Sequence, residues 1–447
     1  MSPPTARIPV LLGARIPVLL RESAFRRYWS AQVVSLIGDQ ISLIAIPLVA
    51  VIVLGADAAE MGLLKTAELL PALLLSLPAG AWIDRRSRRR RIMIAADLLR
   101  ALLIVSLPVA YVVGVLTLAQ LYAVAFAVGA CAVVFDICNA TLFVSLVPKS
   151  RFVAGNSLLN GSRAMAFVSG PGAGGLLVQV LAVPLALLAD ALTFLYSAAL
   201  LARIAPVEPP PAPSAKGYLT EGVRWALRHP TVRVMCAASG TVQFFNLMFH
   251  TLFVFYATTE LGLQPAFLGA VLGSGAIGGL IGAATAGRVV RGMGIGPAIL
   301  LGYAGFTVPL LLVPLAGGAT PLVVALLFLA EFLSSVGVML VDISSGSLLA
   351  ALIPDALRSR VAGASRTLNY GFRPLGAMAG GALGTVLGLR PTLWIATAGA
   401  TLCLLWLLPS PVPRIRTLPG AATGQESQPE PGLAPSASLP ERAGEGT

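Results

Sequence analysis

Charged residues are scarce in this chain of 447 residues, because Asp, Glu, Lys and Arg together make up only 11% of it. A soluble globular protein carries about 25% charged residues. Hydrophobic residues account for 57% of the chain, and a soluble fold of this length has no interior large enough to bury them all. The low charge excludes a soluble protein. It predicts a polytopic membrane protein whose length divides into spanning helices of about 20 residues.

Residue types and motifs that catalysis needs are also rare or missing. The chain has two histidines, and its four cysteines match neither a zinc site nor a disulfide framework. No GxxxxGK[ST] segment occurs, so ATP hydrolysis by this chain is not expected. These absences predict a protein that is not an enzyme and has no cofactor or metal. A proton gradient would then be the driving force for any work it performs.

Apolar stretches long enough to cross a bilayer occur twelve times. Each must be a helix, because lipid offers no hydrogen-bond partner to backbone polar groups. We predict an all-α protein with two six-helix bundles at 28–203 and 233–408. They are joined by a proline-rich linker with an amphipathic helix at 204–232 and flanked by cytoplasmic tails at 1–27 and 409–447. The spans are expected near 28–54, 61–83, 92–115, 118–142, 156–178, 183–203, 233–257, 266–287, 297–316, 321–344, 366–388 and 391–408.

Basic residues are concentrated in every second loop. The net charge is +12, and 24 of the 31 basic residues lie in the terminal segments or in alternate loops, including six arginines within "GAWIDRRSRRRR" at 80–91. The intervening loops contain one, Arg390. Basic loops remain in the cytoplasm, so both termini are predicted to be cytoplasmic. The arginines therefore mark membrane topology, and no nucleic-acid partner is expected.

An internal repeat supports two equivalent halves. Residues 134–148, "VFDICNATLFVSLVP", align without gaps on 340–354, "LVDISSGSLLAALIP", at an offset of 206. Asp136 matches Asp342, and Pro148 matches Pro354. Two parallel six-helix halves related across the membrane normal are a transporter architecture.

These features together resemble the major facilitator superfamily of secondary transporters over about residues 22–410. "GAWIDRRSRR" at 80–89 is similar to the signature of its loop 2–3, with Ser87 where that pattern usually has glycine. The strings "FRRYWSAQVVSLIGDQIS", "DLLRALL", "SGPGAGGLL" and "EGVRWALRHP" resemble the macrolide-efflux-like branch of drug:proton antiporters. The resemblance implies transport by alternating access.

Two motifs receive roles from this resemblance. In the superfamily the acid of loop 2–3 and the following arginine latch the closed inner gate, which implies that Arg88 pairs with Asp136. Plain topology explains the other arginines, whereas an acid within an arginine run does not serve topology. The implied gating residues are Gly80, Asp84, Arg85, Arg88, Arg89 and Asp136. The antiporter-like motif of the fifth span is Gly170, Pro171, Gly174 and Gly175, and it favours antiport although Ala166 stands at a position that is often glycine.

Ionisable residues inside spans are costly and therefore mark functional candidates. A carboxyl group in a low-dielectric site can bind and release a proton near neutral pH, as proton coupling requires. Packing roles remain open for all of them, since Lys65 can neutralise Glu68 and a lone histidine often only bonds a neighbour. Asp97 and Arg100 are spaced to pair on one helix face. The candidates for proton coupling or substrate contact are Asp39, Glu331, Glu68, His250 and Asn246.

The expected function is proton-coupled efflux of amphipathic small molecules by a monomer in the plasma membrane. A permease with another task (uptake, siderophore export or lysolipid flipping) is the first alternative. A membrane scaffold or sensor without transport is the second. The partners expected are a small-molecule substrate, protons and the lipid bilayer.

Overall fold

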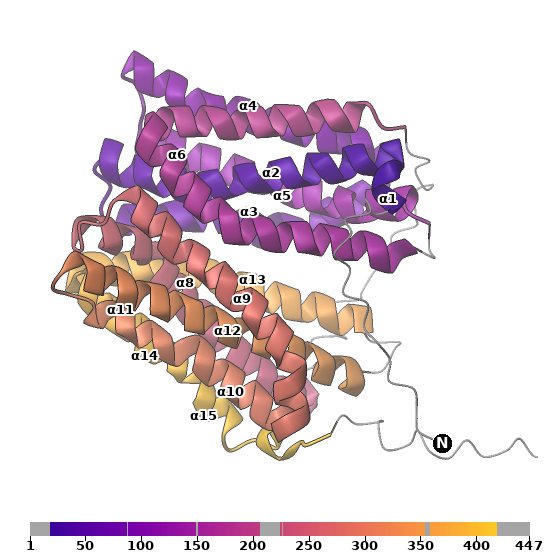
Figure 1. Cartoon of the computed structure of the whole chain (residues 1–447), viewed down its shortest axis with the longest axis vertical. Helices are drawn as coiled ribbons and strands as arrows, with labels where there is room; N and C mark the ends of the chain where they lie inside the picture. The colour runs from indigo at the N-terminus through magenta and orange to yellow at the C-terminus, as the bar shows by residue number, and fades with distance from the viewer. Residues whose placement is uncertain are drawn as a thin grey trace, which may run out of the picture.

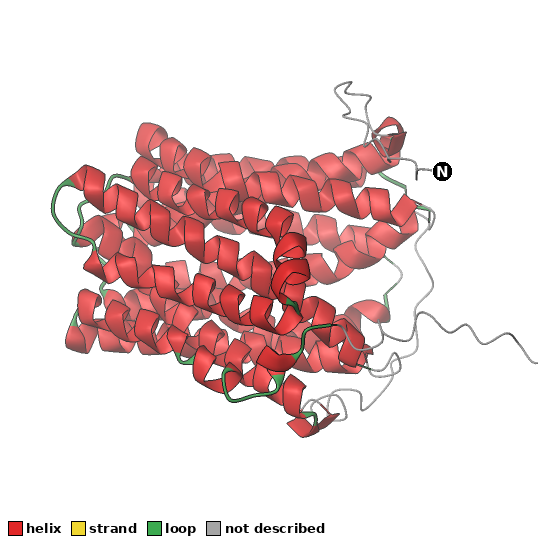
Figure 2. Ribbon diagram, turned by 60° about the horizontal axis from the view of Figure 1, so that its bottom comes forward, coloured by secondary structure: helices red, strands yellow, loops and turns green. Residues whose placement is uncertain are grey.

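The computed structural model describes residues 18–86, 88–148, 151–205, 224–225, 227–353 and 358–417. In this part of the chain all regular structure is helical (Figure 2). Most of the two tails and of the 204–232 linker lies outside the described residues, as do Ser87 and the side chain of Asp84.

The first half of the described chain forms six spans. The second of its long helices, α3, begins with a capping box in which Asp57 and Glu60 each accept a hydrogen bond from the other's backbone N–H at 2.8 Å. The last helix, α6, is two spans joined at Ala182, whose φ of 63° interrupts the helix. The bounds are α1 Val18–Arg21, α2 Ser23–Leu48 continued by η1 Val49–Val53, α3 Ala58–Asp84, α4 Arg89–Val113, α5 Leu118–Leu146 and α6 Phe152–Ala202.

The second half forms six more spans within the described residues. Proline at the first turn starts α8, α9 and α12, where a missing N–H costs nothing. The bounds are α8 Pro230–Thr259, α9 Pro265–Met293, α10 Ile295–Thr307 continued by η3 Val308–Leu311 and α11 Leu312–Leu315, α12 Thr320–Leu352, α13 Arg358–Leu387, α14 Leu389–Thr401 continued by α15 Cys403–Leu407, and η5 Val412–Arg414.

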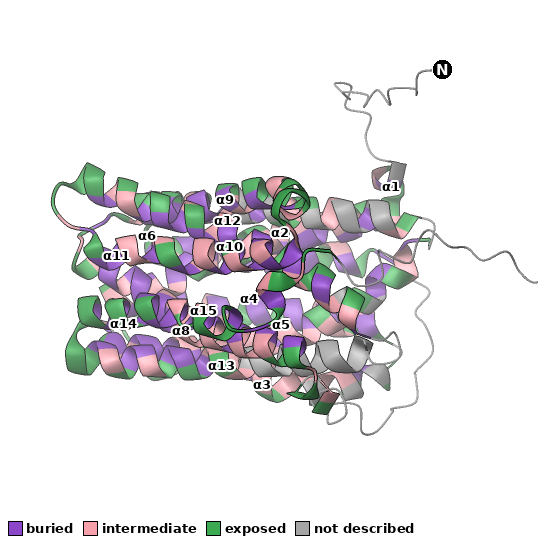
Figure 3. Ribbon diagram, turned by 90° about the horizontal axis from the view of Figure 1, so that it is seen from below, coloured by how far each residue is buried: buried purple, intermediate pink, exposed green. Residues whose placement is uncertain are grey.

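Long apolar faces of these helices point outward. Seven helices in the described part are long and apolar enough to cross a membrane by length and composition alone. The exposed fractions of Leu102, Val112 and Val180 are 67%, 81% and 71%, and exposed residues follow the outer faces of the helices (Figure 3). Exposing such apolar faces to water is unfavourable, whereas exposing them to lipid is not. The predicted all-α membrane fold is therefore confirmed.

The helices form two bundles (Figure 1). Packing within the first joins α2 and α4 to α6 and α3 to α5, and packing within the second joins α9 and α10 to α12 and α8 to α13. Between the bundles, α3 packs on α13 and α6 on α9. The offset of the sequence repeat also applies to the helices, because α4 begins at residue 89 and α10 begins 206 residues later, at residue 295.

The two ends of the molecule differ in charge. We call the end where α2, α4 and α8 begin the basic end, because the exposed side chains of Arg85, Arg86, Arg88 and Arg91 lie there. The opposite, or far, end contains the loops at 54–57, 114–117, 260–264 and 316–319. In Figure 1 the basic end is the right-hand side.

Candidate functional site

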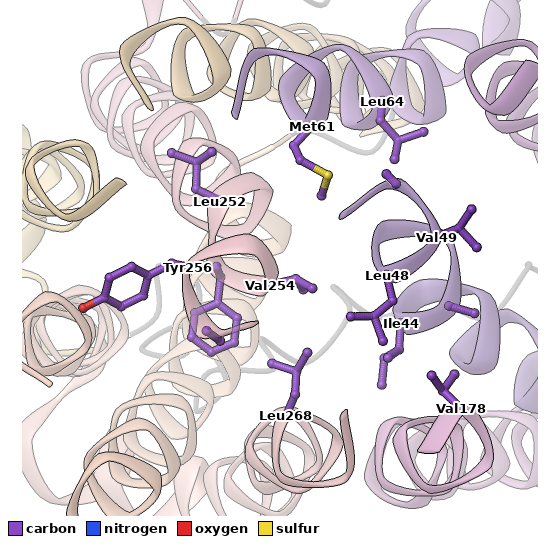
Figure 4. Packing of buried hydrophobic residues seen from close by; sticks show 14 of the residues in the cluster. Ile44, Leu48, Val49, Met61, Leu64, Val178, Leu252, Val254, Tyr256 and Leu268 are labelled. Carbon is purple, nitrogen blue, oxygen red and sulfur yellow. The ribbon is translucent and has the colours of Figure 1, made fainter. Parts of the chain in front are cut away.

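The two bundles are in close contact near the far end. A Cβ atom built on Gly62 of α3 would lie 2.7 Å from the Cα of Gly381 in α13, and one built on Gly175 of α6 would lie 3.1 Å from the Cα of Gly269 in α9. Around these contacts one hydrophobic cluster draws buried residues from both bundles, such as Leu48, Met61, Val178, Leu252 and Leu268 (Figure 4). The far end is therefore sealed by apolar packing.

The basic end is organised differently. Among the described residues, the buried cluster around Phe25, Ile83 and Phe135 contains only residues of the first bundle. The cluster around Ile299 and Leu407 contains only residues of the second. The two halves thus share a core at the far end and have separate cores at the basic end.

Polar side chains meet where α3 faces the second bundle. Lys65 Nζ donates to both carboxylate oxygens of Glu68 at 2.9 Å. The two side chains are 21% and 44% exposed, on the side of α3 opposite the lipid-facing Leu63 and Leu74. Thr66 Oγ1 bonds the carbonyl oxygen of Gly62 at 2.7 Å and lies 3.4 Å from that of Pro374, which holds this turn against α13.

Helix α8 completes this polar cluster. His250 interacts electrostatically with Lys65 of α3 and Arg373 of α13, and its ring contacts Phe249 edge-on at 5.1 Å. Asn246 lies one turn earlier on the same face, and its buried Nδ2 has no hydrogen-bond partner among the described residues. The structure therefore brings together three of the five predicted substrate or proton residues, Glu68, His250 and Asn246. We call these residues, with Lys65 and Arg373, the central cluster.

Asp39 lies elsewhere, midway along α2 in the first bundle. Its side chain is exposed, on the same helix face as Tyr28 and Gln32, which both hydrogen-bond Asn139 of α5. This face points towards α5 and away from lipid. The charged groups that act on Asp39 are Arg100 of α4 and Asp136 of α5. Asp39 thus belongs to a second cluster of charges, inside the first bundle.

Arg100 is at the centre of that second cluster. Its guanidinium lies between the rings of Phe135 and Phe194, 5.3 and 5.2 Å from their centroids. Asp97 lies one turn earlier on the same helix, and its Oδ1 is 3.9 Å from Nη1 of Arg100. The other carboxylate oxygen of Asp97, Oδ2, accepts a hydrogen bond from Ser197 Oγ at 2.7 Å. The ion pair predicted from the i,i+3 spacing is present, at a distance longer than a hydrogen bond.

Two further acidic residues interact electrostatically with Arg100. Asp190 of α6 is fully buried, accepts hydrogen bonds from Ser42 and Thr193, and interacts electrostatically with Asp39 and Arg100. Asp136 is exposed, and the charged groups that act on it are Arg100 and Arg163. The hydroxyl partners are hard to recognise from the sequence alone, because a serine or threonine in an apolar span is common.

Glu331, the fifth candidate, lies between α9 and α12 in the second bundle. It is 7% exposed, and its Oε1 has no hydrogen-bond partner among the described residues. A Cβ built on Gly275 of α9 would lie 3.7 Å from its Oε2. Burial against α9 separates Glu331 from both the central cluster and the charges of the first bundle.

The predicted gating motif lies at the basic end. Arg85 and Arg88 are exposed, Arg89 is buried, and nothing lies within 4 Å of a Cβ built on Gly80. The structure places Asp136 near Arg100 and Arg163, and it does not bring Arg88 to it. Two arginines outside the predicted set have clear roles, because Arg27 and Arg90 donate to the carbonyl groups of Arg203 and Ile204 at the end of α6.

The antiporter-like motif packs α6 against two neighbours. Built Cβ atoms on Gly170 and Gly174 would meet Gln40 of α2, so these glycines allow α6 to approach α2. Pro171 and Gly175 contact Gly269 of α9 in the other bundle. The motif therefore contributes directly to the contact that seals the far end.

A groove of about 430 Å³ lies apart from these residues, between α2 and α6. Its lining is apolar except for Ser162, whose Oγ accepts a hydrogen bond from Trp29 Nε1 at 2.9 Å. It holds none of the five candidate residues.

Comparison with known proteins decides the family. The sequence model of the Major Facilitator Superfamily matches residues 28–376. The chain belongs to this superfamily. It is therefore a multi-pass cell-membrane transporter of small-molecule substrates and not an enzyme. The predicted family and fold are confirmed.

Individual relatives are more distant. The chain is 27% identical over 403 residues to the multidrug efflux pump Tap of Mycolicibacterium fortuitum, and this alignment covers 85% of this chain and 93% of that protein. It is 29% identical over 392 residues to Tap of Mycobacterium tuberculosis, covering 82% and 88%. Among solved structures, a mutant of the nucleoside transporter NupG has a TM-score of 0.74 at 11% identity, covering 86% of this chain and 99% of that one. A bacterial homologue of the iron transporter ferroportin in its inward-facing state has a TM-score of 0.72 at 18% identity, covering 88% and 99%. These structural likenesses show the fold.

Proposed function

We propose that this transporter exports amphipathic small molecules, such as drugs or natural products, by alternating access in exchange for protons. The resemblance to drug:proton antiporters and the similarity to proteins named multidrug efflux pumps support export. Antiport is also supported by the placement of Pro171 and Gly175 at the contact between the bundles. A single chain contains both halves, so the working unit is a monomer.

The basic end faces the cytoplasm in this proposal. Exposed arginines gather there, whereas Asp57, Glu60 and Glu260 lie near the far end. Basic loops are retained on the cytoplasmic side during insertion. Both termini are then cytoplasmic, and the end at which the two bundles have separate cores is the one that takes up substrate from inside the cell.

The observation that carries the proposal is the position of the central cluster. It combines charged and polar groups from α3, α8 and α13 with the rings of α8, where the two bundles face each other. Glu68 lies ten residues and His250 nine residues from the far ends of their helices, which is about 14–15 Å of helix. Substrate held there would be shielded from the far side by the sealed contact. An amphipathic molecule can place its polar group on this cluster and its apolar part on the surrounding side chains.

A host strain that lacks its own efflux pumps provides the test. Expression of the chain is expected to lower susceptibility to a macrolide and intracellular accumulation of the dye ethidium, and Glu68→Gln is expected to reduce this protection at least tenfold. The exposed far-end Glu260→Gln variant is the matched control and should behave like the parent.

Flux in proteoliposomes then separates the alternatives. Ethidium movement that follows an imposed pH gradient, with protons moving the other way, supports the proposal. Inward movement of substrate would replace export by uptake, and movement only of a siderophore or a lysolipid would assign one of those tasks. No flux of any of these compounds in well-inserted protein would favour a scaffold or sensor.

A further inference from the structure

The acidic side chains inside the spans of the first bundle outnumber the basic ones that face them. The titratable and charged groups that face one another there are Tyr28 and Asp39 of α2, Asp97 and Arg100 of α4, Cys131 and Asp136 of α5, and Arg163 and Asp190 of α6. With the tyrosine and the thiol neutral, four carboxyl groups face two guanidinium groups. Uncompensated charge at this depth is costly, so the balance favours carboxyl groups that hold protons.

The hydrogen bonds around Arg100 are incomplete. Asp97 is fully buried, yet its Oδ1 accepts no hydrogen bond among the described residues. Arg100 is 4% exposed, and its buried Nε donates none there. The guanidinium carbon lies 5.3 Å and 5.2 Å from the ring centroids of Phe135 and Phe194, and these cation–π contacts hold the group near Asp97 without a close ion pair. The arrangement leaves room for a change of partner when a carboxyl group gains or loses a proton.

The second bundle shows that such charges are not needed to fold six helices in this way. At the repeat offset of 206, Asp97, Arg100 and Ser197 correspond to Tyr303, Phe306 and Cys403, and Asp39 and Asp190 correspond to Phe245 and Ala396. The equivalence is structural as well, because Tyr303 interacts with Cys403 and Asp342. Among these positions the second bundle keeps only the acid Asp342, the counterpart of Asp136. The extra charges of the first bundle therefore serve a task other than packing.

We propose that Asp39, Asp97, Asp136 and Asp190 around Arg100 form the proton-binding site of the transport cycle, and this inference rests on the proposed proton-coupled function. Asp39 and Asp136 are exposed and exchange protons with water. Asp97 and Asp190 are buried and store the proton. On uptake, a hydronium ion transfers a proton to one carboxylate and leaves as water. The protonated carboxyl group has lost its negative charge, so Arg100 interacts instead with a neighbouring carboxylate.

The ligand is a proton rather than a metal ion. No group of three or more His, Cys, Asp or Glu side chains in the described part of the chain converges closely enough to hold a metal. Hydroxyl groups, in contrast, can accept a hydrogen bond from a protonated carboxyl group or donate one to its ionised form. Ser42 and Ser197, which bond Asp190 and Asp97, therefore suit both states of the site.

Infrared difference spectroscopy of the full chain in proteoliposomes, with pH as the only variable, tests the site directly. The wild type should show a protonated-carboxyl band that falls as the pH rises, and Asp97→Asn together with Asp190→Asn should lose most of that pH-dependent band. Ser197→Ala keeps every carboxyl group, so the band should remain and shift in frequency. Asp342→Asn is the matched control from the second bundle and should retain the band unchanged.

Other outcomes overturn the assignment. If Glu331→Gln abolishes the pH-dependent band and the double aspartate variant keeps it, the proton site lies in the second bundle. Should the aspartate variants fail to fold, Asp97→Tyr with Ser197→Cys copies the pair that already packs in α10 and α15, and it should also weaken the band. Because the band needs no substrate, it can be lost in these variants even if export is never observed. Export with an unchanged band would leave the proposed function standing and reject this site.

Discussion

Substituting Gly175 tests whether glycine contacts hold the far end closed. A Cβ at this position would lie 3.1 Å from the Cα of Gly269 and closer still to the carbonyl oxygen of Pro265, whereas ordinary contacts begin at 3.4 Å. The obstacle is backbone on a neighbouring helix, so α6 and α9 must separate for Gly175→Ala to fit. Overpacking of this kind costs about 1–3 kcal/mol. The closed far end should therefore lose about five- to 150-fold in relative population.

Gly172→Ala is the matched control in the same helix. Nothing lies within 4 Å of a Cβ built on Gly172, so this change should only improve helix propensity, by about 0.5–1 kcal/mol. Spin labels on cysteines placed at the exposed Val115 and Ala319, after removal of the four native cysteines, would report the separation of the two bundles at the far end. Longer distances are expected for Gly175→Ala and unchanged ones for Gly172→Ala. Equal distance distributions in the two variants would refute the reasoning.

Three further predictions concern single residues. Tyr28→Phe removes a buried 2.6 Å hydrogen bond to Asn139, so the free energy of unfolding should fall by about 1–2 kcal/mol, measured by thermal unfolding in detergent; an unchanged midpoint would contradict this. Ala182→Gly should stabilise the protein by about 1 kcal/mol, because φ of 63° suits glycine, whereas Ala189→Gly inside the helix should destabilise it. Asp84→Asn should leave membrane insertion intact and slow ethidium export, and normal flux would remove this residue from the gate.

Much of the fold could be predicted from the sequence. Apolar runs and alternating basic loops place most helix ends within a few residues of their positions in the structure, because lipid forces every spanning segment to satisfy its own backbone hydrogen bonds. The exceptions are the end of α12 and the start of α13, which each lie eight residues outside the expected spans. The internal match of Asp136 with Asp342 likewise indicates two similar halves, and the structure extends the same offset to the starts of α4 and α10.

The candidate site was less predictable. The sequence identifies ionisable side chains whose burial in spans costs free energy, but it does not say which of them lie close together in the fold. These residues are Asp39, Glu68, His250 and Glu331. In the structure, Glu68 and His250 lie in the same cluster, and Asp39 lies in a different one around Arg100. Glu331 is buried against α9. The rotation of each helix about its axis decides these groupings, and that rotation depends on packing between segments far apart in the chain.

The sequence by itself determined that this chain is a membrane transporter with two repeated halves, because composition, span length and loop charge follow from the bilayer as solvent. Only the tertiary structure decided that the far end is sealed by glycine contacts between α3 and α13 and between α6 and α9. It also decided that the acidic residues that interact with Arg100 gather inside the first bundle. Both features depend on which side chains meet across helices, and a pattern along one helix does not contain that information.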